Sequence, residues 1–283
     1  MENFPLYRWW KAQEIEKKLP ERLLKSRERY CVAACSRFRT MNYLKDHAWV
    51  LSDQGKCVAA MLLHSSRTLF PVFNGNKDVY IPAFLLRALK NIDIYAIQGL
   101  KHETEMLERI LSPLGFKAVK SKEYNLMMFD KHAAVNINKA PADLFLRICQ
   151  KEDLERLLPL QEIYEKEEVL PSPDKFDRRV CRYNLSKIIS KGQCLIAEID
   201  GQIVGKLNTN AESFSCNQIG GVFVLPSHRG KGIATCMTAA FTRRISSAGK
   251  EVTLYVKKQN APAAAVYKKC GFQKIADYRI VYM

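Results

Sequence analysis

VFVLPSHRGKGIA, residues 222–234, joins an apolar run to a turn in which basic residues alternate with glycines. The run is typical of a strand, and the residues after Gly232 are typical of a helix start. Backbone amides at a helix start have no partner within the helix and lie at the positive end of its dipole. Gly230 and Gly232 let a ligand approach these amides without meeting a Cβ atom. We therefore expect the turn to bind an anion such as a phosphate group.

The spacing excludes two common phosphate-binding loops. A Walker A loop ends in Gly-Lys-Ser or Gly-Lys-Thr, whereas Gly232 is followed by Ile233 and Ala234. A dinucleotide fingerprint needs a third glycine where this chain has Thr235, and it belongs to a first strand–helix–strand unit rather than to a late one. Neither of these nucleotide-binding loops accounts for the turn.

The rest of the chain alternates between helical and strand patterns, and the predicted elements fall into two similar series. The first series is a helical pattern at 19–38, strands around a turn at 53–56, and helices at 81–91 and 101–114 that bracket a strand at 92–97. The second is a strand at 143–148, a helix at 152–170, a hairpin at 194–211, a strand at 219–225, a helix at 235–248, a strand at 252–256, and a last helix and strand. This order predicts an α/β protein with a mixed sheet.

The two series also end alike. LGFKAVKSKEYNLMM at 114–128 and CGFQKIADYRIVYM at 270–283 each follow a short helix with a Gly-Phe pair. A glycine after a helix is also an ordinary C-terminal cap, so the shared element order carries more weight than the pair itself. Together they predict an internal duplication with a boundary near residue 135, which gives domains at 1–135 and 136–283.

The glycine-rich turn resembles the acyl-CoA loop of the GNAT superfamily of N-acetyltransferases. The superfamily pattern is Arg/Gln-x-x-Gly-x-Gly/Ala between a strand and a helix, and the six residues from Arg229 to Ala234 meet it. The second motif of the superfamily has an Asn after a strand, a short alanine-rich helix, a Tyr and a Gly-Phe pair. LYVKKQNAPAAAVYKKCGF at 254–272 is similar to it, with Asn260 and Tyr267 two helical turns apart on one face.

The resemblance covers residues 141–283 and implies two tandem GNAT-like domains, the second of which binds acetyl-CoA. In the first domain only the element order is similar. Leu111 stands there where Tyr267 does, Thr104 stands where Asn260 does, and no Arg-x-x-Gly-x-Gly precedes them. The resemblance therefore implies a degenerate first domain without a usable cofactor site.

The resemblance also implies the roles of individual residues. Amides of the turn would hold the diphosphate of the cofactor, and main-chain groups of the preceding strand would hold the pantetheine. The cofactor-binding residues that this implies are Val222, Phe223, Val224, Arg229, Gly230, Lys231, Gly232, Ile233, Ala234 and Asn260. Asn260 is alternatively a plain helix cap.

The implied reaction is the transfer of an acetyl group to a primary amine by direct attack on the thioester, which needs a proton donor for the leaving thiolate. Tyr267 is the candidate acid, with a packed helix tyrosine as the alternative. Glu168, in the acidic segment IYEKEEVLPSP, is the candidate base, with a solvated acidic face as the alternative. The acceptor is expected to be a small-molecule or peptide amine.

Composition sets the remaining expectations. The net charge of +16 favours anionic partners, and it also fits a nucleic-acid-binding protein, although no arginine-rich tract or known reader motif is present. A protein that binds CoA without turnover is the other alternative. Nine scattered cysteines without metal spacing, and no recognisable targeting or membrane-spanning segment, favour a soluble cytoplasmic protein without metal. A homodimer is compatible with these features.

Overall fold

Each half of the chain runs strand, two helices, three strands, helix, strand, helix, strand. The computed structural model describes residues 8–14, 17–75, 79–133, 140–170 and 172–283. The first half contains β1 (Arg8–Lys11), α1 (Lys18–Ser26), the 3-10 turn η2 (Glu28–Tyr30), α2 (Val32–Arg39), β2 (His47–Asp53), β3 (Lys56–His64), β4 (Thr68–Phe73), α3 (Ala83–Lys90), β5 (Ala96–Leu100), α4 (Lys101–Leu111) and β6 (Lys120–Phe129). The second half contains β7 (Phe145–Ile148), η4 (Lys151–Asp153), α5 (Leu154–Tyr164), η5 (Glu165–Val169), α6 (Arg178–Ser190), β8 (Cys194–Ile199), β9 (Gln202–Glu212), β10 (Cys216–Val224), η7 (Pro226–His228), α7 (Ile233–Ser247), β11 (Glu251–Lys257), α8 (Ala261–Lys269) and β12 (Phe272–Tyr282). The repeated order confirms the predicted α/β class.

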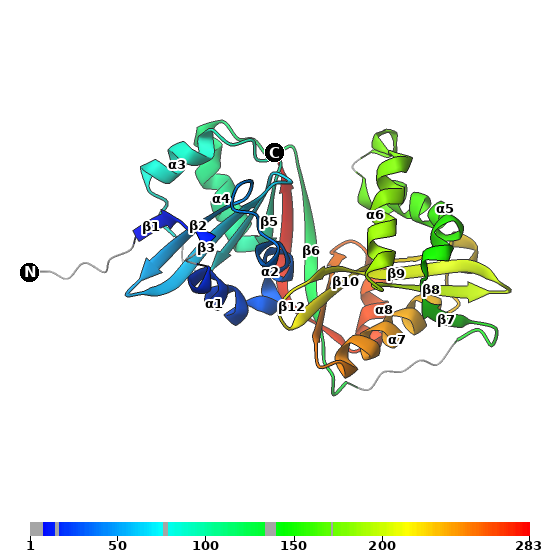
Figure 1. Ribbon diagram of the computed structural model, residues 1–283. Coiled ribbons are helices and arrows are strands. Elements are labelled where there is room, and N and C mark those ends of the chain that lie inside the picture. Colours follow the sequence, from blue (N-terminus) through cyan, green and yellow to red (C-terminus); the bar gives the residue numbers. More distant parts are fainter. Residues whose placement is uncertain (1–7, 15–16, 76–78, 134–139, 171) are drawn as a thin grey trace, which may run out of the picture.

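The two halves share one twelve-stranded sheet because they exchange their last strands. The strand order is β1-β2-β3-β4-β5-β12-β6-β11-β10-β9-β8-β7. The last strand of the second half, β12, therefore lies between β5 and β6 of the first, and β6 lies between β12 and β11 (Figure 1). All the pairings of β6 and β12 are antiparallel. Separating the halves would break three strand pairings, so this exchange fixes how they sit together.

Helices cover both faces of the sheet in each half. In the second half, α5 and α6 lie on one face, and α7 and α8 lie on the other (Figure 1). The first face buries Leu157 and Leu185, and the second buries Met237 and Phe241. This three-layer arrangement buries one stripe of each amphipathic helix against the sheet. No helix in the described parts of the chain is long and apolar enough to cross a membrane.

The structure confirms several local predictions and corrects others. Both predicted hairpin turns are present, with Gln54–Gly55 and Asp200–Gly201 at positive φ as a two-residue hairpin loop requires. The strand predicted at 92–97 is wrong in position, because β5 starts at Ala96 in register with β12 of the other half. The boundary predicted near residue 135 lies outside the described residues.

The helical pattern predicted over 19–38 is interrupted, and the interruption serves a contact between the halves. The chain leaves helical geometry at Arg27 and Cys31, which presents Glu28 to the turn between β9 and β10. The Glu28 carboxylate accepts hydrogen bonds from the amides of Ser215 (2.5 Å) and Cys216 (3.0 Å), from the Ser215 hydroxyl (2.7 Å) and from Ser213. Tertiary partners thus outweigh the local preference for one continuous helix.

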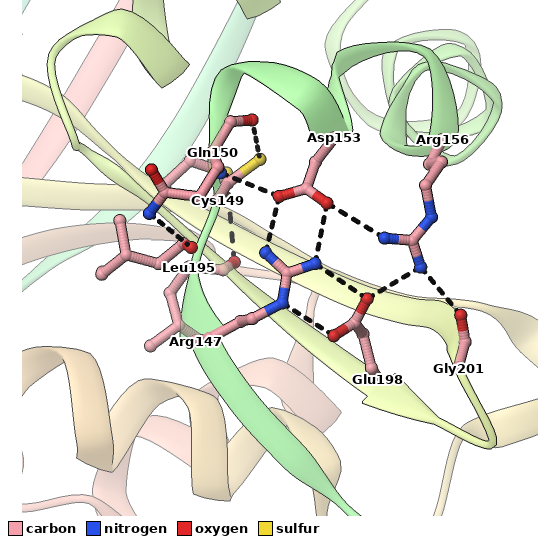
Figure 2. Close-up of polar contacts among 10 residues, drawn as sticks. Arg147, Cys149, Gln150, Asp153, Arg156, Leu195, Glu198 and Gly201 are labelled. Atoms are coloured by element: carbon pink, nitrogen blue, oxygen red, sulfur yellow. Dashed lines mark hydrogen bonds and ion pairs between the residues drawn. The ribbon is translucent and has the colours of Figure 1, made fainter.

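An ion-pair network holds the edge strand β7 at the far end of the second half. Arg147 on β7 contacts Asp153 in η4 at 2.6 and 2.7 Å and Glu198 on β8 at 2.8 and 3.0 Å (Figure 2). Arg156 contacts the same two carboxylates and the carbonyl of Gly201. The hydrogen bond from Arg147 lowers the pKa of Asp153 to about 2. The network joins β7, η4, α5 and the β8–β9 turn.

Candidate functional site

Two neighbouring parallel strands of the second half separate and open a gap in the sheet. Residues 216–219 of β10 pair with residues 251–254 of β11, and the pairing stops there although both strands continue. The amide of Leu225, just after β10, donates to the carbonyl of Val204 at 2.9 Å. Val204 lies on β9, which flanks β10 on the side away from the gap. Because backbone groups alternate along a strand, the N–H and C=O of Val224 point the other way, into the gap. The gap therefore exposes strand edge that can accept an extended ligand.

The turn after β10 supplies backbone amides at the mouth of this gap. Gly230 and Gly232 have φ values of +78° and +82°, and α7 begins directly afterwards at Ile233. The amides of residues 230–235 donate no hydrogen bond to the backbone of any residue that the structure describes. Arg229 fixes the turn, because its Nε donates to the Val224 carbonyl at 3.0 Å. The predicted anion site therefore has the backbone geometry that its sequence indicates.

A cleft of about 890 Å³, which we call the loop cleft, brings nearly all the predicted site residues together. The loop cleft is lined by Glu168, Val222, Phe223, Val224, His228, Arg229, Gly230, Gly232, Ile233, Ala234, Thr235, Asn260, Pro262, Ala263, Val266, Tyr267 and Lys269. Of the predicted cofactor-binding residues, only the side chain of Lys231 stands outside this lining. The lining also includes residues outside the predicted set, namely His228, Thr235, Pro262, Ala263, Val266 and Lys269.

Tyr267 lies in the interior of the loop cleft, on the inner face of α8. Its side chain is 8 % exposed and packs edge-on against Phe272. Burial raises the pKa of Tyr267, and nearby Tyr164, Cys270 and Glu168 add to the shift. The phenol therefore keeps its proton throughout the physiological pH range. A buried, protonated phenol in a cleft can donate a proton to a leaving group.

Asn260 begins the helix that carries Tyr267. Its Oδ1 accepts the amide of Ala263 at 3.0 Å, and Pro262 occupies the first turn. Asn260 therefore caps the helix, which was the alternative to a cofactor-binding role. The cap uses only the carbonyl oxygen of the side chain. The Nδ2 group can still donate to a ligand in the cleft.

Glu168 lies on a π-helical turn at the end of α5, where the sequence predicts a continuous α-helix. The amide of Leu170 donates to the Glu165 carbonyl at 2.9 Å, five residues back, which defines the wider turn. Lys257 of β11 contacts the Glu168 carboxylate at 2.6 Å, and Arg229 contacts the neighbouring Glu167 at 3.2 Å. The π turn therefore places both carboxylates over the gap, where each already has a cationic partner.

A bulge in β10 next to the gap rests on polar side chains that the sequence analysis missed. The pairing of β10 with β9 shifts between Gly220 and Phe223, and Gly221 has a φ of +59°. Lys206 and Asn208 on β9 lie directly beneath, joined by a 2.9 Å hydrogen bond from Lys206 Nζ to Asn208 Oδ1. Burial lowers the pKa of Lys206 to about 8. Consecutive glycines in an apolar strand are a signal for such a bulge.

We expect Gly221→Ala to destabilise the protein by about 2 kcal/mol or more, because it combines positive φ with overlap. A Cβ at this position would lie 2.5 Å from Asn208 Oδ1 and 2.7 Å from Lys206 Nζ. Chemical denaturation measures the effect. Gly192→Ala is the matched control, since Gly192 has a φ of +63° with no heavy atom within 4 Å of the added Cβ. Equal losses in the two variants would show that the side chains beneath the bulge do not hold it.

A second cleft, of about 910 Å³, opens on the other side of the gap between the two halves, and we call it the inter-half cleft. Residues of α2, β4 and β5 from the first half line it together with residues of β9, β10 and β11 from the second. The two clefts share Glu168, Val222, Asn260, Ala263 and Tyr267. A ligand bound in the loop cleft and a ligand bound in the inter-half cleft would therefore meet at Tyr267.

The corresponding place in the first half is closed by a side chain. Strands β4 and β5 pair only at residues 68–69 with 96–97, and the amide of Phe73 at the end of β4 donates to Glu103 of α4 at 2.9 Å. Thr104, predicted to stand where Asn260 does, lies inside α4 rather than at its start, so that alignment is wrong. Leu111, the residue of the first half that is predicted to correspond to Tyr267, is buried in the core of that half.

We expect Glu103→Gln to stabilise the protein above pH 7. Burial raises the pKa of Glu103 to about 7, so ionising this group costs stability as pH rises from the ordinary carboxyl value of 4.5 through 7. The amide keeps an acceptor for Phe73 without the charge, and the expected gain is about 1–3 kcal/mol at alkaline pH, vanishing in acid. Denaturation across pH checks this, with Glu105→Gln, at a half-exposed glutamate of the same helix, as control. A variant less stable than the wild type at alkaline pH would show that Glu103 is needed as an anion.

Solved structures share this architecture over the whole chain. A Drosophila protein covers 99% of the chain and 99% of its own length with a TM-score of 0.70 at 14% sequence identity. A tandem GNAT protein from the clavulanic acid biosynthesis pathway covers 98% of both chains with a TM-score of 0.59 at 13% identity. The fold is therefore that of a tandem GNAT protein.

A family model and a curated relative are similar to parts of the chain in sequence. The sequence model of the FR47-like protein family matches residues 201–281, which include β10, the glycine-rich turn and α8. A mycothiol acetyltransferase from Saccharomonospora viridis is 33% identical over 116 residues, which are 37% of this chain and 38% of that enzyme. The chain thus spans less than two fifths of this curated relative. The chain is thus similar in sequence to FR47-like proteins and to a mycothiol acetyltransferase, and its second half carries the motifs that resemble those of the GNAT superfamily.

Proposed function

We propose that the protein is an acetyl-CoA-dependent N-acetyltransferase whose second half holds the reaction site. The observation that carries the proposal is the meeting of the two clefts at Tyr267. One cleft has the exposed strand edge and the free amides that a CoA thioester requires, and the other is open to an acceptor. The mycothiol acetyltransferase relative and the FR47-like match support the same class of reaction.

The residues of the loop cleft fit acetyl-CoA. The unpaired amides of residues 230–235 and the basic side chains of Arg229 and Lys231 suit a diphosphate. The edge of β10 at Val222–Val224 suits the two amides of a pantetheine chain, with Asn260 Nδ2 as a further donor. When bound, acetyl-CoA supplies the activated acetyl group.

Each residue near the reacting end has a separate task in this proposal. The walls of β10 and α8 hold the reacting end of the thioester in one orientation and limit access of water. Tyr267 holds a proton at Oη, within the cleft, for the departing thiolate. Glu168 accepts the amine's proton, directly or through water, once its contact with Lys257 loosens. The attacking amine must enter from the inter-half cleft, because the loop cleft holds the cofactor.

An acceptor-panel assay that measures release of free CoA from acetyl-CoA tests the proposal. We expect release that depends on an added primary amine and saturates with it. Binding of CoA without release for any amine would instead favour a CoA-binding protein without turnover. Retention on DNA or RNA that falls steeply with salt would favour a nucleic-acid-binding protein.

A further inference from the structure

The inter-half cleft extends well beyond the meeting point at Tyr267. Arg39 of α2 donates to the carbonyls of Ser213 (2.5 Å) and Glu212 (3.3 Å), at the turn where β10 begins. Val222, shared with the loop cleft, lies near the opposite end of β10. Six residues of strand separate Cys216 from Val222, a span of about 20 Å. The cleft is therefore long enough for an elongated acceptor.

Cationic side chains outnumber carboxylates along this cleft. The cationic lining residues are Arg37, Arg39, Lys122, Lys191 and Lys257, and the carboxylates are Glu168 and Glu212. Both carboxylates already have cationic partners, because Glu168 contacts Lys257 and Glu212 contacts Lys250 from outside the cleft. Little negative charge thus remains for a cationic ligand.

Four of the cations have no carboxylate partner among the residues that the structure describes, and one of these four, Arg39, is held by the two main-chain carbonyls. Arg37 lies on α2 two residues before Arg39, and Lys191 lies two residues before Gln193, which donates to Glu212 at 3.0 Å; both cations are exposed and line the cleft. Lys122 lies nearer Tyr267 and donates only to the Val169 carbonyl, at 3.3 Å. Burial lowers the pKa of Lys122, and Lys257 and Lys120 lower it further, whereas nearby Glu168 raises it.

A buried polar side chain in the wall of the cleft also lacks a partner. Gln218 of β10 is 5 % exposed and lines the inter-half cleft. Its Oε1 has no hydrogen bond from any residue that the structure describes. Buried amide groups are nearly always satisfied, so an unpaired one beside a cleft points to a polar ligand.

We propose that the inter-half cleft binds an elongated acceptor that carries its amine at one end and an anionic group, a carboxylate or a phosphate, at the other. The amine lies at Tyr267, Gln218 contacts the polar middle of the acceptor, and Arg37 and Lys191 bind the anionic end. This assignment of the acceptor rests on the proposed acetyltransfer. It gives the first half a task, because α2 supplies Arg37.

Matched peptides test both the length and the charge. Glycine, triglycine and pentaglycine are compared with their C-terminal amides in the CoA-release assay, and Gly-Gly-Gly-Gly-phosphoserine amide tests phosphate. Five extended residues span about 17 Å, so pentaglycine reaches the cations and glycine does not. We expect the acid to exceed its amide in kcat/KM by about tenfold for pentaglycine, and by much less for glycine. A phosphoserine peptide better than the free acid would assign the site to phosphate.

Arg37→Gln combined with Lys191→Gln should remove the preference for the acid by raising its KM about tenfold, with kcat and the KM of the amide unchanged. Arg87→Gln, at an exposed residue of α3 outside the lining of both clefts, is the matched control. Equal use of acid and amide at every length, or a preference that survives the double substitution, would overturn the proposal.

Calorimetric titration of pentaglycine and its amide into the protein gives a readout that needs no turnover. Tighter binding of the acid, lost in the double variant, would support the anionic subsite even if no amine released CoA, in which case only the acetyltransfer would be wrong. CoA release without any effect of charge on binding or rate would refute the subsite alone.

Discussion

Tyr267→Phe should lower kcat for amine-dependent CoA release by about 100-fold or more, because a positioned proton donor contributes on this scale. Phenylalanine keeps the ring packed against Phe272 and removes only the hydroxyl group. The KM for acetyl-CoA should change little, since the turn and the β10 edge remain intact. Because burial raises the pKa of Tyr267, its protonation adds no fall in rate between pH 6 and 9, so wild type and variant should differ by a constant factor there. Steady-state kinetics across this range measure the effect.

Two further tyrosine variants make the test of Tyr267 specific. Tyr183→Phe removes an exposed phenol on α6 and should leave kcat unchanged. Tyr164→Phe removes another phenol close to Tyr267, one whose pKa burial raises to about 12. A loss of kcat in Tyr164→Phe together with normal turnover in Tyr267→Phe would transfer the role of acid to Tyr164.

Glu28→Ala should lower the free energy of unfolding by about 3 kcal/mol, because several buried or partly buried donors lose one acceptor at once. The amides of Ser215 and Cys216 would be left beneath η2 without a partner, whereas the Ser213 hydroxyl would keep the Cys216 carbonyl as an acceptor. Denaturation by urea measures the loss, and Glu152→Ala, at an exposed glutamate, should have little effect. A change below about 0.5 kcal/mol would contradict the assigned role of this contact between the halves.

The contribution of Glu28 should also depend on pH. Burial alone would raise the pKa of Glu28, but hydrogen bonds from Ser213, Ser215 and Cys216 outweigh burial and lower it. A carboxyl group with a lowered pKa stabilises the fold fully above its ordinary value of 4.5 and loses this contribution as pH falls below it. The difference in stability between wild type and Glu28→Ala should therefore be constant near neutral pH and shrink in acid.

Sequence patterns with local causes were predictable. The glycine-rich turn, the capped helix after Asn260 and the two-residue hairpin loops depend on neighbours a few residues away, and the structure contains each of them. Helix α6 also carried local signals that were not used. Asp177 caps it by accepting the amides of Arg179 and Val180, and apolar residues follow at helical spacing.

Features that depend on distant partners were not predictable from local pattern. The exchange of β6 and β12 sets the position of β5, although the pairing residues lie about 180 positions apart in the chain. Strand β4 contains Pro71, which normally argues against an internal strand; here the pairing of β4 with β5 ends at Leu69, so Pro71 does not have to donate a hydrogen bond to β5. The position of Lys206 and Asn208 beneath the Gly220–Gly221 bulge likewise depends on the register of β9 with β10.

Calorimetric comparison of acetyl-CoA with acetyl-pantetheine, which lacks the diphosphate and nucleotide, tests the central claim most directly. The unpaired amides of residues 230–235 and Arg229 should make acetyl-CoA bind at least about 100-fold more tightly, since each charge-assisted hydrogen bond to the diphosphate adds affinity. Arg229→Gln should reduce that advantage, and Arg87→Gln should not. Equal affinity for the two thioesters, or no binding of either, would contradict the account.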